Sequence, residues 1–404
     1  MWDKGLNFIL IILLFIYMFG FIWGIPCLVI FVFLFDTIAP SFGYERITDT
    51  DIKFVLLGEI RNINYSFFLE IEKIDFESFE KKVYERLISE ILRMRQVPVN
   101  YFGFYFWKEI DPELARQQVI KVNKKFEDEA SFFKYLGELT NQYMEKGKPL
   151  CEFRLIEDYT EDTSMIIFRA QHSFGDAVGC ASMFSALNDD QFSIPNKKSF
   201  PSYGVWQKLI LLVSTIFRFG KVSKKMKKIK TDENTKKIFK KSTAKISQTR
   251  YAYSNTEIPL EAIKAYYKEY EGMTLNDFAL AIFGKSFYQY CKQEGIEDCQ
   301  LLKCAMPVSH KTLPTGYDNL CIKNYAIFTY LQLYLTDSIE SGFKKMKPYL
   351  KYILSPDVQK QFINHEHIAP YCSKSSMLND FLAGGKGNYF SLSNFILSDR
   401  PYVI

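Results

Sequence analysis

His172 and Asp176 are spaced as H-x-x-x-D in the stretch IIFRAQHSFGDAVGC, residues 166–180. A neutral imidazole, with an ordinary pKa near 6.5, can take a proton from a hydroxyl as that hydroxyl attacks a thioester carbonyl. An aspartate near a helix start can accept backbone N–H bonds or bind a cation. A polar residue that merely ends a strand is the simpler interpretation, and the spacing alone does not decide between the two.

Two strands and a helix are expected to position this pair. The runs LCEFRLIED and SMIIFRAQ, residues 150–158 and 164–171, flank the turn YTEDTS and indicate two strands. A helix is expected to begin near Asp176. The same half is expected to hold a turn-rich joint at 36–51 followed by an alternating stretch, helices over 75–96 and 131–145, and a strand pair over 99–111.

The second half again mixes helices and strands. The stretch MTLNDFALAIFGKSFYQYC, residues 273–291, predicts a long buried helix entered through the caps Thr274 and Asn276. Residues 299–309 and 324–335 are strand candidates. Two halves of this kind indicate an α/β or α+β protein of two domains.

Residues 6–35 form an uncharged apolar run of 30 positions, which as a helix of about 1.5 Å per residue exceeds a hydrocarbon core of roughly 30 Å. A cleavable signal peptide has a shorter apolar region, a basic start and a small-residue cleavage site. Gly24 and Pro26 interrupt the run, so either one kinked span or a hairpin returning to the same face is expected. The run predicts contact with membrane lipids.

A short apolar helix at 206–220 leads into a basic segment, residues 218–250. That segment has 13 Lys or Arg against only Asp232 and Glu233, whereas the whole chain has a net charge of +5. Clustered lysines after an apolar helix suit an anionic membrane surface. A solvated linker between domains is the alternative. Nucleic acid is not an expected partner, because no base-reading motif accompanies the charge.

Metal and disulfide chemistry are not expected. The eight cysteines include no CxxC pair and no short Cys/His spacing of the zinc type. In a chain of 404 residues they are interpreted as reduced, mostly buried thiols.

Five blocks, in order, resemble motifs of the wax ester synthase/diacylglycerol acyltransferase family. Residues 148–179 resemble the segment ending in its HHxxxDG motif, and 274–291 resemble its helix beginning with an Asn-Asp pair. CAMPVSHKTL at 304–313 is similar to its Pro-Val-Ser strand. IKNYAIFTYLQLYL at 322–335 is similar to its Gly-Asn strand, and SLSNF at 391–395 to its Ser-Asn segment. The order of the blocks is more specific than any single one.

The resemblance implies the CoA-dependent acyltransferase fold, also called chloramphenicol acetyltransferase-like, with two similar mixed-sheet α/β halves, here preceded by a transmembrane segment. Acyl-CoA would enter a tunnel between the halves as co-substrate, and a fatty alcohol or diacylglycerol would enter from the other side, with no bound cofactor. The motif's second histidine, the general base, maps onto His172. Its aspartate maps onto Asp176 and would hold the shape of the loop.

Further candidates for substrate or oxyanion binding lie in the same blocks. A side-chain amide near the cleft, such as that of Asn394, could donate to developing negative charge. The full set is Gln171, Gly175, Asn276, Ser309, Asn324, Ser393 and Asn394.

The chain departs from the family pattern at four positions. Gln171 stands at the motif's first histidine, Ala177 at its glycine, Lys323 at the glycine of the Gly-Asn block, and Cys151 at the usual tryptophan. Because the chain stops at Ile404, the C-terminal half is expected to be shortened. These departures keep a second class of function open, a catalytically inactive structural subunit of a membrane protein complex.

The sequence thus predicts a membrane-anchored O-acyltransferase, in the endoplasmic reticulum membrane or alternatively the mitochondrial inner membrane. The predicted division is a transmembrane anchor at 1–36, a first half at 37–200, a membrane-surface linker at 201–250 and a second half at 251–404.

Overall fold

The structure, a computed structural model, divides into two compact units. The first unit comprises residues 1–199, 311–325 and 396–404, and the second comprises 200–310 and 326–395. The residues that it describes are 13–14, 17, 38–47, 49–60, 62–101, 104–189, 229–240, 259–309, 316–320, 322–324, 326–355, 358 and 390–391.

Residues 311–325 of the predicted second half belong to the first unit, where Leu320 and Ile322 pack with the main apolar core. The segment 322–324 thereby comes next to residues about 150 positions earlier in the chain.

The first unit is built on a mixed four-stranded sheet with the order β2-β7-β6-β5. The β5 and β6 strands are parallel, and the other neighbouring pairs are antiparallel. The strands are β2 (Asn64–Glu72), β5 (Val119–Lys121), β6 (Cys151–Ile156) and β7 (Thr163–Gln171). The two strands predicted around the turn at 159–164 are therefore confirmed.

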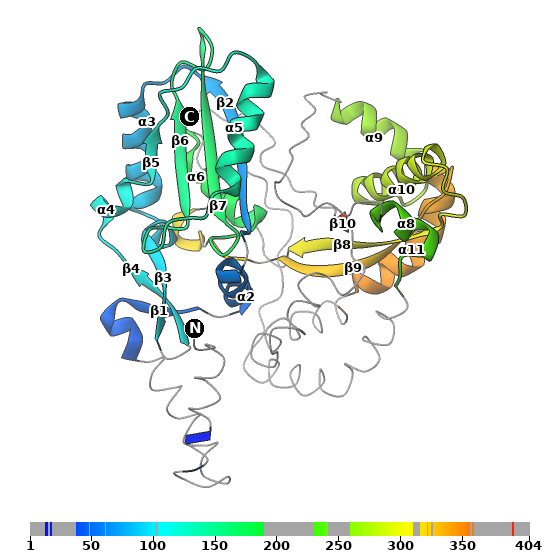
Figure 1. Ribbon diagram of the computed structural model, residues 1–404, viewed down its shortest axis with the longest axis horizontal. Helices are drawn as coiled ribbons and strands as arrows, with labels where there is room; N and C mark the ends of the chain where they lie inside the picture. The colour runs from blue at the N-terminus through cyan, green and yellow to red at the C-terminus, as the bar shows by residue number, and fades with distance from the viewer. Residues whose placement is uncertain are drawn as a thin grey trace. The chain divides into compact units, whose positions relative to one another are not determined.

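Helices cover both faces of this sheet (Figure 1). On one face, α5 (Glu129–Asn141) packs against Met165 and Ile167 of β7. On the other face, Ile166 and Phe168 meet α3 (Phe76–Val83), its π-helical continuation η2 (Tyr84–Ile88) and α6 (Ala177–Leu187). Because the central strand is buried on both faces, it reads as a continuous apolar run.

A smaller antiparallel sheet with the order β1-β4-β3 completes the first unit. The predicted pair at 99–111 is confirmed, although β3 begins three residues earlier, at Gln96. The expected turn-rich joint at 36–51 is wrong at its end, since α2 begins at Asp49 and replaces the start of the alternating stretch. The elements are η1 (Ala39–Phe42), β1 (Tyr44–Arg46), α2 (Asp49–Ile60), η3 (Leu92–Arg95), β3 (Gln96–Tyr101), β4 (Phe104–Glu109), α4 (Pro112–Arg116) and η4 (Tyr317–Asn319).

The second unit also has a mixed sheet, with the order β10-β8-β9. β8 is antiparallel to β9 and parallel to β10. Apolar residues of α10 and α11 pack against β8 and β9 to form its core. The elements are α8 (Glu233–Lys240), α9 (Leu260–Lys268), α10 (Leu275–Gln293), β8 (Leu301–Ser309), β9 (Ala326–Tyr334), α11 (Ile339–Ile353) and β10 (Phe390–Ser391).

The long helix α10 has one of its two predicted caps. Thr274 is the N-cap, and its hydroxyl accepts a bond from the Asp277 backbone N–H at 3.2 Å. The Asp277 carboxylate in turn accepts from the Thr274 backbone N–H, which completes a capping box. The prediction for Asn276 is wrong, because this residue lies exposed inside the first turn.

Two predicted membrane segments lie largely outside the described residues. Of residues 6–35 only Leu13, Leu14 and Tyr17 are described, and of 206–250 only 229–240. Among the parts of the chain that the structure describes, none of the helices has the length and apolar character needed to cross a membrane.

Candidate active site

His172 lies where the central strand of the first unit ends. Its backbone N–H donates to Ile63 O at 3.3 Å, just beyond the pairing of β7 with β2. The chain then turns, with Phe174 N donating to Gln171 O at 2.8 Å, and α6 begins after Asp176. The predicted strand-to-helix turn is therefore confirmed, and it leaves the half-buried imidazole at the strand end.

Two aromatic rings hold the plane of the imidazole. Phe54 of α2 stacks on it, with 4.0 Å between ring centroids and 9° between planes. Tyr65 of β2 meets it edge-on at 5.6 Å and 72°. With one ring on its face and another at its edge, the His172 side chain has a defined orientation.

Asn324, from the distant segment 322–324, contacts both the ring and the main chain of His172. Its Oδ1 lies 2.9 Å from His172 Nδ1. Its Nδ2 donates to His172 O at 2.8 Å and to Asp51 Oδ1 at 2.9 Å. The backbone N–H of Asn324 also donates to Asp51 Oδ1, at 2.9 Å.

These bonds decide which nitrogen of a neutral His172 carries the proton. Both Nδ2 contacts of Asn324 are to oxygen acceptors, so its amide orientation is fixed and Oδ1 faces the imidazole. A carbonyl oxygen only accepts, so Nδ1 must donate. Neutral His172 is then protonated on Nδ1 and has its lone pair on Nε2, the nitrogen that can act as a base.

Asp51 anchors Asn324 from the buried side. Its Oδ2 accepts from Arg93 Nη2 at 3.2 Å, and the side chains of both residues are only 5% exposed. Burial raises the pKa of Asp51 above its ordinary value, while the charge of Arg93 and the bonds from Asn324 pull the pKa down. The groups of Arg93 and Asn324 that contact the Asp51 carboxyl group are all donors, which is the environment that a carboxylate requires.

Arg93 ties the same network to the protein core. Its Cζ lies 3.8 Å from the ring centroid of Trp107, a cation–π contact in a buried setting. Its Nε donates to Ile322 O at 3.1 Å, so the guanidinium holds the segment 322–324 at two points, directly and through Asp51.

The turn between His172 and α6 fits closely against this segment. A Cβ added to Gly175 would lie 2.8 Å from Ile322 Cγ2, so the approach requires a glycine. Asp176 is the N-cap of α6, and its Oδ1 accepts from the N–H groups of Val178 and Gly179 at 3.0 Å each. Asp176 N donates to Lys323 O at 3.4 Å. This geometry suits the loop-holding role expected of Asp176.

Three of the four residues that depart from the family pattern, Gln171, Lys323 and Cys151, have hydrogen-bond partners of their own. Gln171 Oε1 accepts from Ser173 Oγ, and a Cβ on Gly58 would lie 2.6 Å from Gln171 Nε2. Lys323 Nζ reaches Glu45 Oε1 at 3.3 Å. Cys151, buried at the start of β6, donates through Sγ to Gln118 Oε1 at 3.0 Å.

The remaining candidates are not among the described residues of the first unit. Asn276 is exposed on α10 and Ser309 ends β8, both in the second unit, and the side chain of Ser309 is not described. Ser393 and Asn394 lie outside the described residues. Of the predicted site residues, the first unit thus brings together Gln171, His172, Gly175, Asp176 and Asn324.

Three residues of the site were missed from the sequence: Asp51, Phe54 and Arg93. No motif marks them, and their contacts join segments 42 to 273 positions apart. The one available signal was Arg93, which lies between the apolar residues Leu92 and Met94 at a position that the fold buries.

The thiol of Cys180 lies beside Tyr65, whose ring meets that of His172. The Sγ of Cys180 lies 2.9 Å from Tyr65 Oη. Burial raises the pKa of Cys180 to about 12, despite the opposing effect of its bond to Tyr65. Because the thiolate is the reactive form, this thiol is inert at neutral pH.

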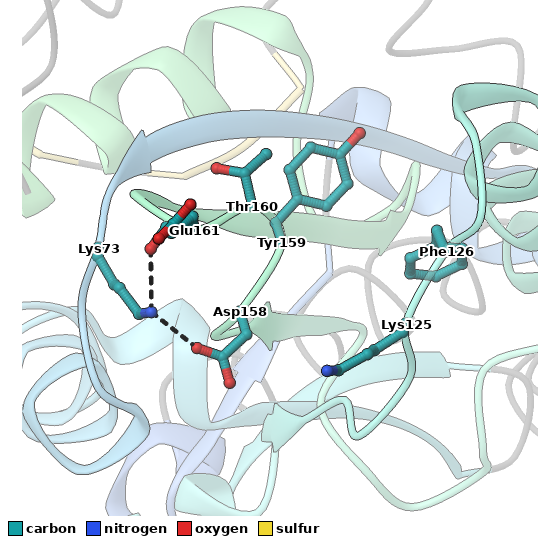
Figure 2. A pocket seen from close by; sticks show the side chains of 7 residues that line it. All are labelled: Lys73, Lys125, Phe126, Asp158, Tyr159, Thr160 and Glu161. Carbon is teal, nitrogen blue, oxygen red and sulfur yellow. Dashed lines mark hydrogen bonds and ion pairs between the residues drawn. The ribbon is translucent and has the colours of Figure 1, made fainter.

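A surface hollow of about 380 Å³ lies at the opposite end of β7 (Figure 2). Lys73 Nζ crosses it to Asp158 Oδ1 at 3.0 Å and to Glu161 O at 3.1 Å. None of the predicted site residues lines it. In the described parts of both units, no group of three or more His, Cys, Asp and Glu could hold a metal ion.

Neither a protein-family model nor a curated protein matches the sequence. Solved structures do match. The starter condensation domain of rhizomide synthetase in complex with C8-CoA and Leu-SNAC is similar over 87% of this chain and 78% of that one, with TM-score 0.53 and 11% identity. The first condensation domain of the calcium-dependent antibiotic synthetase covers 88% of this chain and 82% of its own, with TM-score 0.55 and 10% identity.

A third similar structure is the trichothecene 15-O-acetyltransferase from Fusarium sporotrichioides, at TM-score 0.55 and 12% identity, over 85% of this chain and 78% of that one. The chain therefore has the condensation-domain and CoA-dependent acyltransferase fold, with mixed sheets, as predicted. At these identities the likeness is one of fold.

Proposed function

We propose that this chain is a membrane-anchored O-acyltransferase that moves a long-chain acyl group from acyl-CoA to a fatty alcohol or diacylglycerol. The observation that carries the proposal is the imidazole of His172, oriented by Phe54 and Asn324 with Nδ1 as donor, at a strand end in an acyltransferase-type fold. Two similar structures support the chemistry, an O-acetyltransferase and a domain in complex with C8-CoA.

The proposed reaction needs one base and no covalent enzyme intermediate. His172 Nε2 takes the proton of the acceptor hydroxyl as the hydroxyl oxygen bonds to the thioester carbonyl carbon. The resulting tetrahedral intermediate collapses with cleavage of the C–S bond. The departing CoA thiolate takes the proton from Nε2, which restores the neutral imidazole and yields an ester and free CoA.

The proposed membrane anchor is residues 6–35, which are uncharged. Only Asp36 and Thr37 separate that run from Ile38, so Ile38 can lie no more than roughly 11 Å from its end. Ile38 and Phe42 around η1 are 52% and 71% exposed, and Tyr101 of β3 is 42% exposed. Exposed apolar and aromatic side chains of this kind suit a bilayer interface, which supports contact of this face with lipid headgroups. The membrane that we propose is that of the endoplasmic reticulum or, alternatively, the mitochondrial inner membrane.

The test is an acyl-transfer assay with purified full chain, labelled long-chain acyl-CoA and a panel of fatty alcohols and diacylglycerols. We expect labelled ester from the wild type and a loss of about 10²- to 10⁴-fold in His172→Ala, the usual contribution of a general base. A wild-type rate no higher than that of His172→Ala with every acceptor would overturn the enzyme proposal in favour of a structural subunit.

A further inference from the structure

We propose that Asn324 and Asp51 are positioning residues that hold His172 in the tautomer with its base nitrogen at Nε2 and stabilise the imidazolium formed during acyl transfer. The part concerning acyl transfer rests on the proposed function, whereas the part concerning the tautomer does not. Neither residue touches the reacting atoms in this account.

The hydrogen bonds of Asn324 fix the orientation of its side-chain amide. Asn324 is held by three bonds through its own N–H groups, two to Asp51 Oδ1 and one to His172 O, of 2.8 to 2.9 Å. Rotating the amide by 180° would turn its oxygen toward Asp51 Oδ1 and His172 O, two unfavourable contacts between acceptors. The oxygen therefore faces Nδ1, and the Nε2–H tautomer would leave two acceptors opposed.

Asn324 also connects the imidazole of His172 to the carboxyl group of Asp51. The hydrogen bonds run in series from His172 Nδ1–H to Asn324 Oδ1, and from Asn324 Nδ2–H to Asp51 Oδ1. A carboxylate accepting from the amide polarises it and makes its oxygen a better acceptor. When Nε2 takes a proton, the positive charge of the ring is met by that oxygen. The proton on Nδ1 stays on Nδ1, and the amide transmits no proton.

A positioning role of Asn324 and Asp51 has a consequence that a packing role does not have. Arg93 and Asp51 also fasten the segment 322–324, so removing either disturbs the fold locally. A packing role alone would lower stability without selecting a tautomer. The tautomer of His172 is therefore the readout that distinguishes the two roles.

The primary test is ¹⁵N NMR of the full chain labelled at histidine, above the pH at which imidazole is charged. The chain has four histidines, and a His172→Gln sample identifies the His172 signals. We expect Nδ1 to carry the proton and Nε2 to have the shift of an unprotonated nitrogen. The reverse assignment in the wild type overturns the proposal without any substitution.

Asn324→Leu keeps the size of the side chain and removes the acceptor. We expect the Nε2–H tautomer, which imidazole prefers in water, and a fall in kcat of about 10²-fold or more with KM little changed, since a wrong tautomer disables the base. The matched control is Gln332→Leu, another buried amide, which bonds Lys230 O and Leu302 O in the second unit. It should lower stability while leaving the His172 signals as they are.

Asp51→Asn removes the carboxylate behind the amide. We expect a drop in kcat of about tenfold, comparable to removal of an outer partner of a functional histidine, with the Nδ1–H tautomer retained. The control is Asp232→Asn in the second unit, which also removes a carboxylate that accepts several hydrogen bonds.

An unchanged tautomer and unchanged kcat in folded Asn324→Leu would overturn the positioning role. Absence of acyl transfer in the wild type would instead overturn the proposed function, and the NMR result would stand.

Discussion

Two aspartates fasten distant segments, one in each unit, and their surroundings differ. Asp51 accepts from Asn324 and from Arg93 inside the first unit, and burial raises its pKa. Asp232 accepts from Gln300 N at 2.9 Å and Leu301 N at 2.6 Å in the second unit. Burial also acts on the pKa of Asp232, but N–H donors, including that of Thr235, outweigh it and lower the pKa.

The two aspartates differ in the groups that their hydrogen bonds connect. Asp232 is surrounded by backbone N–H groups and one hydroxyl, which stabilise its charge and join α8 to the start of β8. Burial disfavours the charged form of Asp51 and raises its pKa, and the bonds of Asp51 lead to an imidazole. Ionisable groups held against such a cost are characteristic of functional sites.

The largest expected effect is the loss of stability when either aspartate is replaced by alanine. Asp51→Ala leaves the Arg93 guanidinium buried without its carboxylate, so we expect a loss of about 3–5 kcal/mol in the free energy of unfolding. Asp232→Ala should cost about 1–3 kcal/mol, because its backbone donors lie nearer to solvent. Urea denaturation followed by circular dichroism measures both. Equal losses in the free energy of unfolding would remove the distinction between Asp51 and Asp232.

A second pair of substitutions compares two glycines where elements approach closely. In Gly175→Ala the new Cβ would meet Ile322 Cγ2 at 2.8 Å, and in Gly284→Ala it would meet Tyr334 O at 2.9 Å. We expect each to cost about 1–3 kcal/mol. Only Gly175→Ala should also lower kcat, since it displaces the segment that carries Asn324.

Adding Ile322→Ala to Gly175→Ala removes the Cγ2 methyl group that the new Cβ would meet and should restore part of the lost kcat. Acyl-transfer kinetics of the single and double variants check this. A double variant no faster than Gly175→Ala would show that the Ile322 contact does not transmit the effect.

The pH dependence of stability should differ between wild type and Asp232→Asn. A lowered folded-state pKa contributes stability that is present above the unfolded-state pKa of about 3.9 and is lost as pH falls through the folded-state value. We therefore expect the urea concentration at the unfolding midpoint of the second unit to decrease in the wild type as the pH is lowered below about 4. The decrease should be less steep in the variant. Parallel curves would mean that Asp232 carries no such contribution.

The smallest expected effect is at the exposed face around η1. The double variant Phe42→Ser and Tyr101→Ser should weaken binding of the full chain to vesicles by a few-fold, because both side chains are exposed apolar groups. Leu114→Ser, at an exposed site on α4 that is 57% accessible, is the control. Flotation with neutral and anionic vesicles measures binding, and equal behaviour of the two variants would argue against a specific interfacial face.

Local patterns were enough to predict the frame that positions His172. The apolar run of β7, the turn after it and the helix start at Asp176 follow from neighbouring residues. Thr274 was similarly recognisable as a cap, whereas Asn276 was misassigned because Asp277 completes the capping box. Asp51 was placed in a turn, because its Thr- and Asp-rich surroundings resemble one and the apolar residues that follow show no clear helical period.

The positioning network could not be derived in this way. Asn324 became a candidate only through the family resemblance, which assigned it to substrate or oxyanion binding, and its contact with Nδ1 of His172 is visible only in the structure. Arg93 and Asp51 act through contacts across the tertiary fold, and no local spacing encodes such contacts.

The most direct test of the central claim is CoA release from a long-chain acyl-CoA, measured by rapid mixing with and without a fatty alcohol. If His172 is a general base for direct transfer, release requires the alcohol, proceeds without a stoichiometric burst, and is lost in His172→Ala but kept in Gln332→Leu. A burst of CoA without alcohol, or wild-type release in His172→Ala, would contradict the account.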